Sequence, residues 1–126
     1  MYHHIHHRIT AHKISFGHAI RGIVWALKTQ PNYQVHLFLS ILSLVGGIYL
    51  GIHPFEWLVV LLLITLGLTV ETINTALEMT LDCISLERRD DIKHAKDAAA
   101  GAMLIISVGS FICACYIFLP YILNII

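Results

Sequence analysis

The stretch Glu71-Thr-Ile-Asn74-Thr-Ala-Leu-Glu78-Met-Thr-Leu-Asp82 directly continues an apolar run over residues 57–70. No Gly-Pro or polar turn signal separates the two parts, so the sequence predicts one continuous helix. At about 100° per residue, the three acids and the asparagine fall within an arc of roughly 80°. These four residues, here called the acidic stripe, begin where a membrane-spanning segment should reach its interface. Carboxylates are costly there, so a functional site is the first hypothesis.

The composition around this stretch indicates a membrane protein. The chain has 126 residues, of which 57% are hydrophobic and 13% charged. Soluble domains are roughly 45–50% apolar and 25% charged. The formal net charge is zero with histidine neutral, so nothing suggests a nucleic-acid partner. The length suits a single domain, which we place at residues 13–126 after a flexible His-rich tail over residues 1–12.

Residues 13–30 are predicted to form a helix on the membrane surface. The apolar residues Phe16, Ile20, Ile23 and Leu27 follow one another at spacings of 4, 3 and 4. This pattern gives one apolar face, and the basic residues on another face suit lipid headgroups. Pro31 should end or interrupt this helix.

The rest of the chain is predicted to cross the membrane as helices. The expected spans cover about residues 35–52, 56–84 and 96–119, each long enough for a bilayer. Gly46, Gly47 and Gly51 indicate close helix packing. A polar run over residues 85–97 should form a loop that grades into the third span, which should stop near Pro120. The predicted fold is therefore an all-α membrane protein with an N-terminal amphipathic surface helix and three transmembrane helices.

The basic residues predict the orientation. All eight lysines and arginines lie before the first span or between the second and third. By the positive-inside rule, the N-terminal segment and the 85–97 loop are cytoplasmic and the C-terminus is outside. The acidic stripe therefore runs toward the cytoplasm.

The acidic stripe has the groups that phosphoryl transfer needs. Carboxylates suit Mg²⁺ or another hard divalent cation, which completes its shell with waters and nucleotide phosphates. Glu71 lies deeper than Glu78, and a less solvated carboxylate suits a general base. A deep base, a shallower metal ligand and a nearby lysine fit transfer of a phosphoryl group to a hydroxyl held at the membrane surface.

Three other interpretations of the stripe stay open. Its acids could simply pair with the basic residues of the polar run, namely Arg88, Arg89, Lys93 and Lys96. They could instead line the pathway of a divalent-cation channel or transporter. The chain could also be an assembly subunit without catalysis. No GxxxxGK[ST] motif or kinase-type glycine loop is present, which excludes the nucleotide folds of soluble kinases.

Two motifs in order, Glu71-Thr-Ile-Asn-Thr-Ala-Leu-Glu78 and Ala95-Lys-Asp97-Ala-Ala-Ala-Gly-Ala, resemble the signature of the small prokaryotic diacylglycerol kinase family. That family includes undecaprenol kinases. Residues 16–22 and 30–36 look like its surface-helix region. The resemblance implies a homotrimer in the bacterial inner membrane, with active sites shared between subunits. It also implies transfer of the γ-phosphate of ATP to undecaprenol or diacylglycerol, and the Glu56-Trp57 start of the second span favours the undecaprenol branch.

The resemblance also assigns roles to individual residues. Glu71 matches the general base, Glu78 matches the Mg²⁺ ligand, and Asn74 matches an amide of the motif that would support the site. Asp82 is expected to support the site as a structural residue or as an outer contact near the loop. The nucleotide would be contacted by a larger set, namely His18, Glu78, Glu87, Arg88, Arg89, Lys96 and Asp97. Two positions depart from the family pattern. Gln30, the expected second metal ligand, stands where many relatives have a glutamate, and His18 stands where some have a tyrosine.

Overall fold

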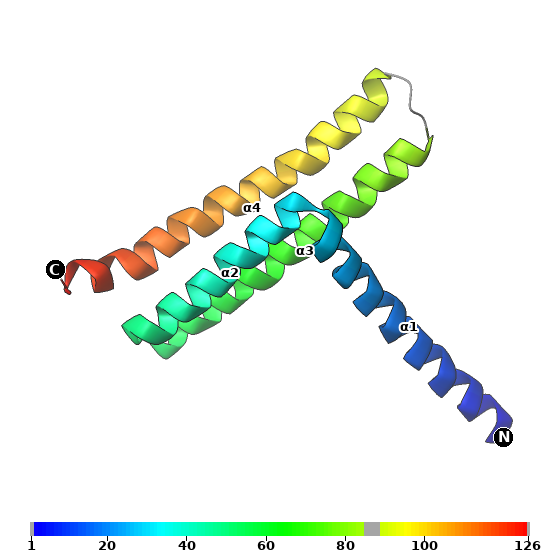
Figure 1. Cartoon of the computed structure of the whole chain (residues 1–126), viewed down its shortest axis with the longest axis horizontal. Helices are drawn as coiled ribbons and strands as arrows, with labels where there is room; N and C mark the ends of the chain where they lie inside the picture. The colour runs from blue at the N-terminus through cyan, green and yellow to red at the C-terminus, as the bar shows by residue number, and fades with distance from the viewer. Residues whose placement is uncertain (1, 85–88, 126) are drawn as a thin grey trace.

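The computed structural model describes residues 2–84 and 89–125, with side chains from Phe16 onward. The described residues form four α-helices: α1 (Tyr2–Thr29), α2 (Pro31–Leu50), α3 (Pro54–Ile84) and α4 (Asp90–Leu123). Helices α2, α3 and α4 pack against one another, with α3 and α4 most extensively in contact. Figure 1 shows α1 leaving this bundle at an angle from the start of α2, which lies part-way along α3.

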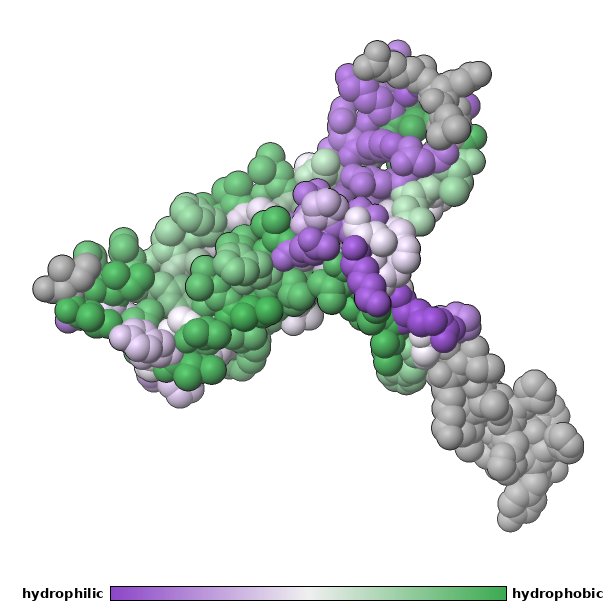
Figure 2. Space-filling view, viewed as in Figure 1, coloured by the Kyte–Doolittle hydropathy of each residue, from purple (hydrophilic) through white to green (hydrophobic). Residues whose placement is uncertain are grey.

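Helices α2, α3 and α4 are each long and apolar enough to cross a membrane. This confirms the expectation of three candidate spans. Their outer faces carry large apolar side chains, such as Phe38, which is 64% exposed, and Ile48, which is 73% exposed. Hydrophilic surface gathers at the end of the bundle where α3 and α4 are joined and along α1, while the rest is mainly hydrophobic (Figure 2). An apolar surface of this extent suits lipid or another subunit.

Proline and glycine separate the helices. Gln30 has extended backbone angles, φ −106° and ψ 109°, and Pro31 occupies the first turn of α2. The predicted interruption of the first helix at Pro31 is therefore confirmed. Gly51 follows α2 in the left-handed region with φ +63°. A side chain there would be strained, so this glycine serves the turn into α3 rather than close helix packing.

Two helix ends differ from the sequence expectation. Helix α1 begins at Tyr2, so residues 2–12, expected as a flexible tail, are helical in the structure. Helix α4 begins at Asp90 and continues through Pro120 to Leu123. Proline removes one backbone donor, and the helix carries on because the amide of Asn124 still donates to the Pro120 carbonyl at 3.2 Å.

A small apolar core lies at the end of the bundle near the α2–α3 turn. Ile52, Val60 and Ile117 are buried there, and Trp57 and Phe118 pack against them. These residues come from the turn, α3 and α4, so the core joins separate parts of the chain. The hydrophilic surface described above lies at the opposite end of the bundle.

A polar contact closes the same end of the bundle. The hydroxyl of Tyr121 on α4 donates to Oε2 of Glu56 on α3 at 2.6 Å. The backbone amide of His53 in the turn donates to the same carboxylate oxygen at 2.7 Å. We call these three residues the tyrosine clasp. It ties α4 to the α2–α3 turn.

Gly47 gives a first prediction, because α2 and α3 approach closely there. A Cβ at this position would lie 2.9 Å from the ring of Trp57 and 3.1 Å from Ile52. We expect Gly47→Ala to lower the free energy of unfolding by about 1–3 kcal/mol, since a rigid ring must shift to admit the methyl group. Unfolding in detergent micelles, followed by circular dichroism, would measure this.

Gly46 provides the matched control for that measurement. A Cβ at Gly46 would meet Phe118 at 3.8 Å, an ordinary contact. We expect Gly46→Ala to be neutral or stabilising, because alanine favours the helix over glycine by up to about 1 kcal/mol. Equal losses from the two substitutions would contradict the close packing proposed for Gly47.

Candidate functional site

The acidic stripe changes from buried to exposed along α3. Glu71 is 2% exposed and Asn74 is 5% exposed. Glu78 is half-buried, and Asp82 is exposed. The prediction that Glu71 is less solvated than Glu78 is confirmed. The amide of Asn74 donates to Oε1 of Glu78 at 3.3 Å, so neighbouring members of the stripe touch as the helical spacing predicts.

The buried end of the stripe has unused hydrogen-bonding capacity. Oε2 of Glu71 and Oδ1 of Asn74 are buried without a hydrogen-bond partner in the part of the chain that the structure describes. Buried polar atoms in proteins are nearly always satisfied, and an orphan calls for an explanation such as a ligand or a catalytic role. The carboxylate oxygen can accept a proton from a bound molecule, and the amide oxygen on the adjacent turn can accept a hydrogen bond from a hydroxyl group of that molecule.

Thr75 is a residue that the sequence analysis did not single out. It is 5% exposed and lies four residues after Glu71, on the same side of α3. Its helical spacing was the available signal, but a threonine in an apolar helix is not distinctive by itself. Its hydroxyl adds another polar group beside the buried carboxylate.

Asp82 and Lys96 join α3 to α4 at the polar end of the bundle. The Lys96 ammonium pairs with Oδ1 of Asp82. The alternative that stripe acids merely pair with basic residues therefore holds for Asp82. Among the described residues, no such pair is formed by Glu71 or Glu78. Asp97, the next residue after Lys96, is exposed.

This ion pair gives a second prediction. Both side chains are partly solvated, with 35% of the lysine and 57% of the aspartate side chain exposed. We expect Asp82→Asn and Lys96→Met each to lower the free energy of unfolding by at most about 1 kcal/mol. Lys93→Met on the same helix is the control, and the measurement is chemical unfolding at low and high salt. A loss above about 2 kcal/mol would show that the pair holds the two helices together.

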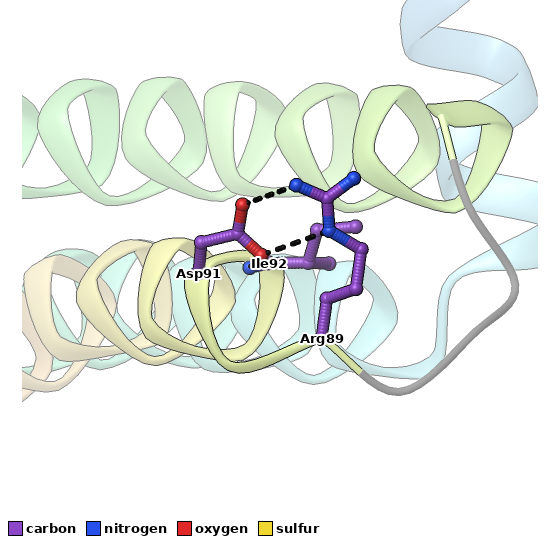
Figure 3. A network of polar contacts seen from close by, with 3 residues as sticks. All are labelled: Arg89, Asp91 and Ile92. Carbon is purple, nitrogen blue, oxygen red and sulfur yellow. Dashed lines mark hydrogen bonds and ion pairs between the residues drawn. The ribbon is translucent and has the colours of Figure 1, made fainter.

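Arg89 lies immediately before α4 and is held in place locally. Its Nε and Nη2 atoms donate to the two carboxylate oxygens of Asp91 at 3.2 and 2.7 Å (Figure 3). This hydrogen bonding raises the pKa of the Arg89 guanidinium above its ordinary value. The exposed guanidinium is thus positioned by Asp91 at the polar end of the bundle. The two preceding candidates, Glu87 and Arg88, lie outside the described residues.

The two positions that depart from the family pattern lie on α1 and at its end. The Arg21 guanidinium donates to Nδ1 of His18 at 2.9 Å, and both residues are exposed. The amide of Gln30, in the break before α2, donates weakly to Oγ1 of Thr29 at 3.5 Å. The break lies close to α3, because a groove is lined by residues from α1, α2 and the segment 64–73 of α3.

The donor set fits a hard divalent cation of the Mg²⁺ kind. The stripe offers carboxylate and amide oxygens, and its one amide oxygen, Oδ1 of Asn74, is buried with no partner in the described residues. No group of three or more histidine, cysteine or acidic side chains in the described residues could hold a metal ion alone. Mg²⁺ commonly uses only one or two carboxylates and completes its shell with waters and phosphates. The residues present suit such a shared site.

The chain matches a known family and several known proteins over most of its length. A family model described as prokaryotic diacylglycerol kinase matches residues 17–118. The chain is 40% identical over 106 residues to an undecaprenol kinase of Bacillus subtilis, covering 84% of this chain and 86% of that protein. It is 30% identical over 112 residues to a diacylglycerol kinase of Synechocystis, covering 88% of this chain and 64% of that one. A diacylglycerol kinase of Pseudomonas aeruginosa is 27% identical over 89 residues, with 71% and 72% covered.

Proposed function

The chain belongs to the prokaryotic diacylglycerol kinase family, and from this premise we propose that it transfers the γ-phosphate of ATP to the hydroxyl of a membrane lipid alcohol. It is a kinase with an alcohol acceptor and a multi-pass membrane protein. The observation that carries the proposed chemistry is the Glu71 carboxylate, which is buried and has an unpartnered oxygen. No comparison supports the cation-channel alternative.

Glu71 is the proposed general base. Its free Oε2 can accept the proton of a lipid hydroxyl that lies at the polar end of the bundle. The lipid oxygen then forms a bond to the γ-phosphorus, while the bond from that phosphorus to the bridging oxygen of ADP breaks. The proton stays on Glu71, the phosphoryl group on the lipid, and ADP leaves. Burial keeps water from competing as the acceptor.

The nucleotide is proposed to lie above Glu71, between the exposed ends of α3 and α4. Arg89 and Lys96 supply positive charge there, and the Asp82 pairing orients Lys96. Asp97 and His18, with Glu87 and Arg88 outside the described residues, complete the proposed nucleotide set. Polyphosphate recognition needs positive charge and donors of this kind.

Mg²⁺ would be held by Glu78 and Gln30 together with the phosphates, and Asn74 would support the position of Glu78. A bound Mg²⁺ ion would neutralise part of the negative charge on the phosphates. The Asn74–Glu78 hydrogen bond observed here fixes one oxygen of that carboxylate and leaves the other available.

The assembly and location follow from the same proposal. We infer a homotrimer in the bacterial cytoplasmic membrane, with the surface helix and the polar α3–α4 connection in the cytoplasm. The broad apolar surface of α2, α3 and α4 supports contact with lipid and with neighbouring copies. The unpartnered buried oxygens support a site that another subunit helps to close.

Purified protein in mixed micelles tests the proposal. ATP-dependent phosphorylation would be measured with undecaprenol and with diacylglycerol, with Mg²⁺ present and after chelation. We expect turnover that needs Mg²⁺, with undecaprenol the better acceptor, in keeping with the Bacillus subtilis relative. The absence of turnover with both lipids would overturn the kinase proposal for this chain.

A further inference from the structure

A cavity of about 210 Å³ lies between α2, α3 and α4. Its α3 wall includes Val60, Gly67 and Leu68. Residues four apart lie above one another on a helix, so Gly67 is one turn from Glu71 on the same face, toward the α2–α3 turn. On α3 the lining of the cavity therefore comes within one turn of the buried carboxylate, and the cavity extends from there into the bundle.

The cavity is more polar at the end near Glu71. The register of α3 and α4 follows from the Lys96–Asp82 pair, and it places Ser110 level with Leu68 in these antiparallel helices. The Gly47–Trp57 contact between α2 and α3 places His36 at the same level. Both His36 and Ser110 line the cavity.

The far end of the cavity is apolar. Val60 and Phe118 line it there, beside the core near the α2–α3 turn. Ser40 and Ser43 also line the wall, but their hydroxyls donate to carbonyls of their own helix at 2.7 and 2.9 Å. A polar end beneath a base and an apolar far end match a lipid alcohol, which has a hydroxyl at one end of a hydrocarbon chain.

We propose that this cavity receives the first carbons of the acceptor's chain and that Gly67 determines which chain can enter. The occupant is a single-chain, branched alcohol of the polyprenol type rather than a two-chain glycerolipid. This inference rests on the proposed kinase function. A cavity of about 150 Å³ holds a benzene ring, so about 210 Å³ holds roughly eight carbon atoms of one chain. When one chain fills that space, the second acyl chain of a glycerolipid has to lie outside it.

Gly67 controls the width of the cavity at the point next to the hydroxyl of the bound acceptor lipid. A Cβ built at this glycine meets nothing within 4 Å, although the residue lies in the middle of a packed helix. A larger side chain at this position projects into the cavity instead of striking a neighbouring helix. The missing side chain leaves room for the methyl branch of a prenyl unit close to the reacting oxygen.

The test compares Gly67→Leu with a matched control. Gly109→Leu on α4 makes the same change where a Cβ also meets nothing within 4 Å, and Gly109 does not line the cavity. Kinetics would be measured with undecaprenol, with a short prenyl alcohol and with diacylglycerol, varying lipid and ATP separately. We expect Gly67→Leu to raise the KM for both prenyl alcohols by about tenfold or more. The KM for ATP should stay the same, and Gly109→Leu should behave as wild type.

A second readout does not depend on turnover. A prenyl alcohol carrying a diazirine within its first two units should label peptides of α3 and α4 that line the cavity, and Gly67→Leu should remove this labelling. Ala114→Leu would narrow the cavity from the α4 side, and it replaces Gly67→Leu in both experiments if Gly67→Leu does not fold. Unchanged prenyl KM values in a folded variant, or labelling only outside the cavity, would overturn the inference. A wild-type protein that phosphorylates no lipid alcohol would overturn the proposed function instead.

Discussion

Glu71→Gln is expected to give a folded protein whose lipid phosphorylation is slower by about 10²–10⁴-fold, the usual contribution of a positioned general base. Glutamine has nearly the same shape as glutamate but cannot take the proton from the acceptor hydroxyl. Because Glu71 is buried, the substitution removes a potential charge from a desolvated position. The thermal unfolding midpoint should therefore not fall. Steady-state kinetics and calorimetry on the same preparation measure both effects.

Glu56→Gln is the matched control. It makes the same chemical change on the same helix, at the end away from the site, where Glu56 accepts the hydrogen bond of the tyrosine clasp. We expect it to lower the unfolding midpoint while leaving turnover near normal. Near-normal turnover in Glu71→Gln would remove that residue from the role of base and would favour an assembly subunit without catalysis.

Glu78→Gln is expected to raise the Mg²⁺ concentration needed for half-maximal turnover by at least about tenfold. Even outer ligands of metal sites are commonly worth about 10–100-fold in affinity, and a direct carboxylate ligand is worth no less. The loss should be partly rescued by high Mg²⁺, unlike the loss in Glu71→Gln. Titration of Mn²⁺ with a non-hydrolysable ATP analogue, followed by electron paramagnetic resonance, reports binding without turnover.

Gln30→Glu tests the other side of the same site. It adds a carboxylate at the break between α1 and α2, where this chain has a neutral amide. We expect it to lower the Mg²⁺ requirement of the wild type and to offset part of the loss in Glu78→Gln. If Gln30→Glu changes neither requirement, Gln30 is not a metal ligand.

The main features of the fold could be predicted from local sequence alone. Apolar runs of sufficient length predict spans wherever they occur, and proline before the first span gives the break at Pro31. The stripe on α3 was predictable because helical periodicity alone places Glu71, Asn74 and Glu78 on one face. Order and spacing of the two motifs were enough to indicate the family, which the family model confirms.

The features that could not be predicted depend on contacts between segments that are distant in the sequence. The Lys96–Asp82 pair needs the register between α3 and α4, which periodicity within either helix does not contain. The cavity under Glu71 depends on the packing of three helices and on one missing side chain at Gly67. One helix end was also inaccurate, because α4 continues through Pro120: the proline removes only its own backbone donor, and the later amide of Asn124 still finds an acceptor.

The tyrosine clasp has a consequence for how the chain is made. The hairpin of α2 and α3 is synthesised first, and at that stage Glu56 lacks the hydroxyl that Tyr121 will donate. Both residues lie at the end of the bundle opposite the α3–α4 connection, so the contact can form only after α4 has run the length of the bundle. The clasp is therefore completed by the last part of the chain, and it ties the end of α4 back to the turn that was synthesised before it.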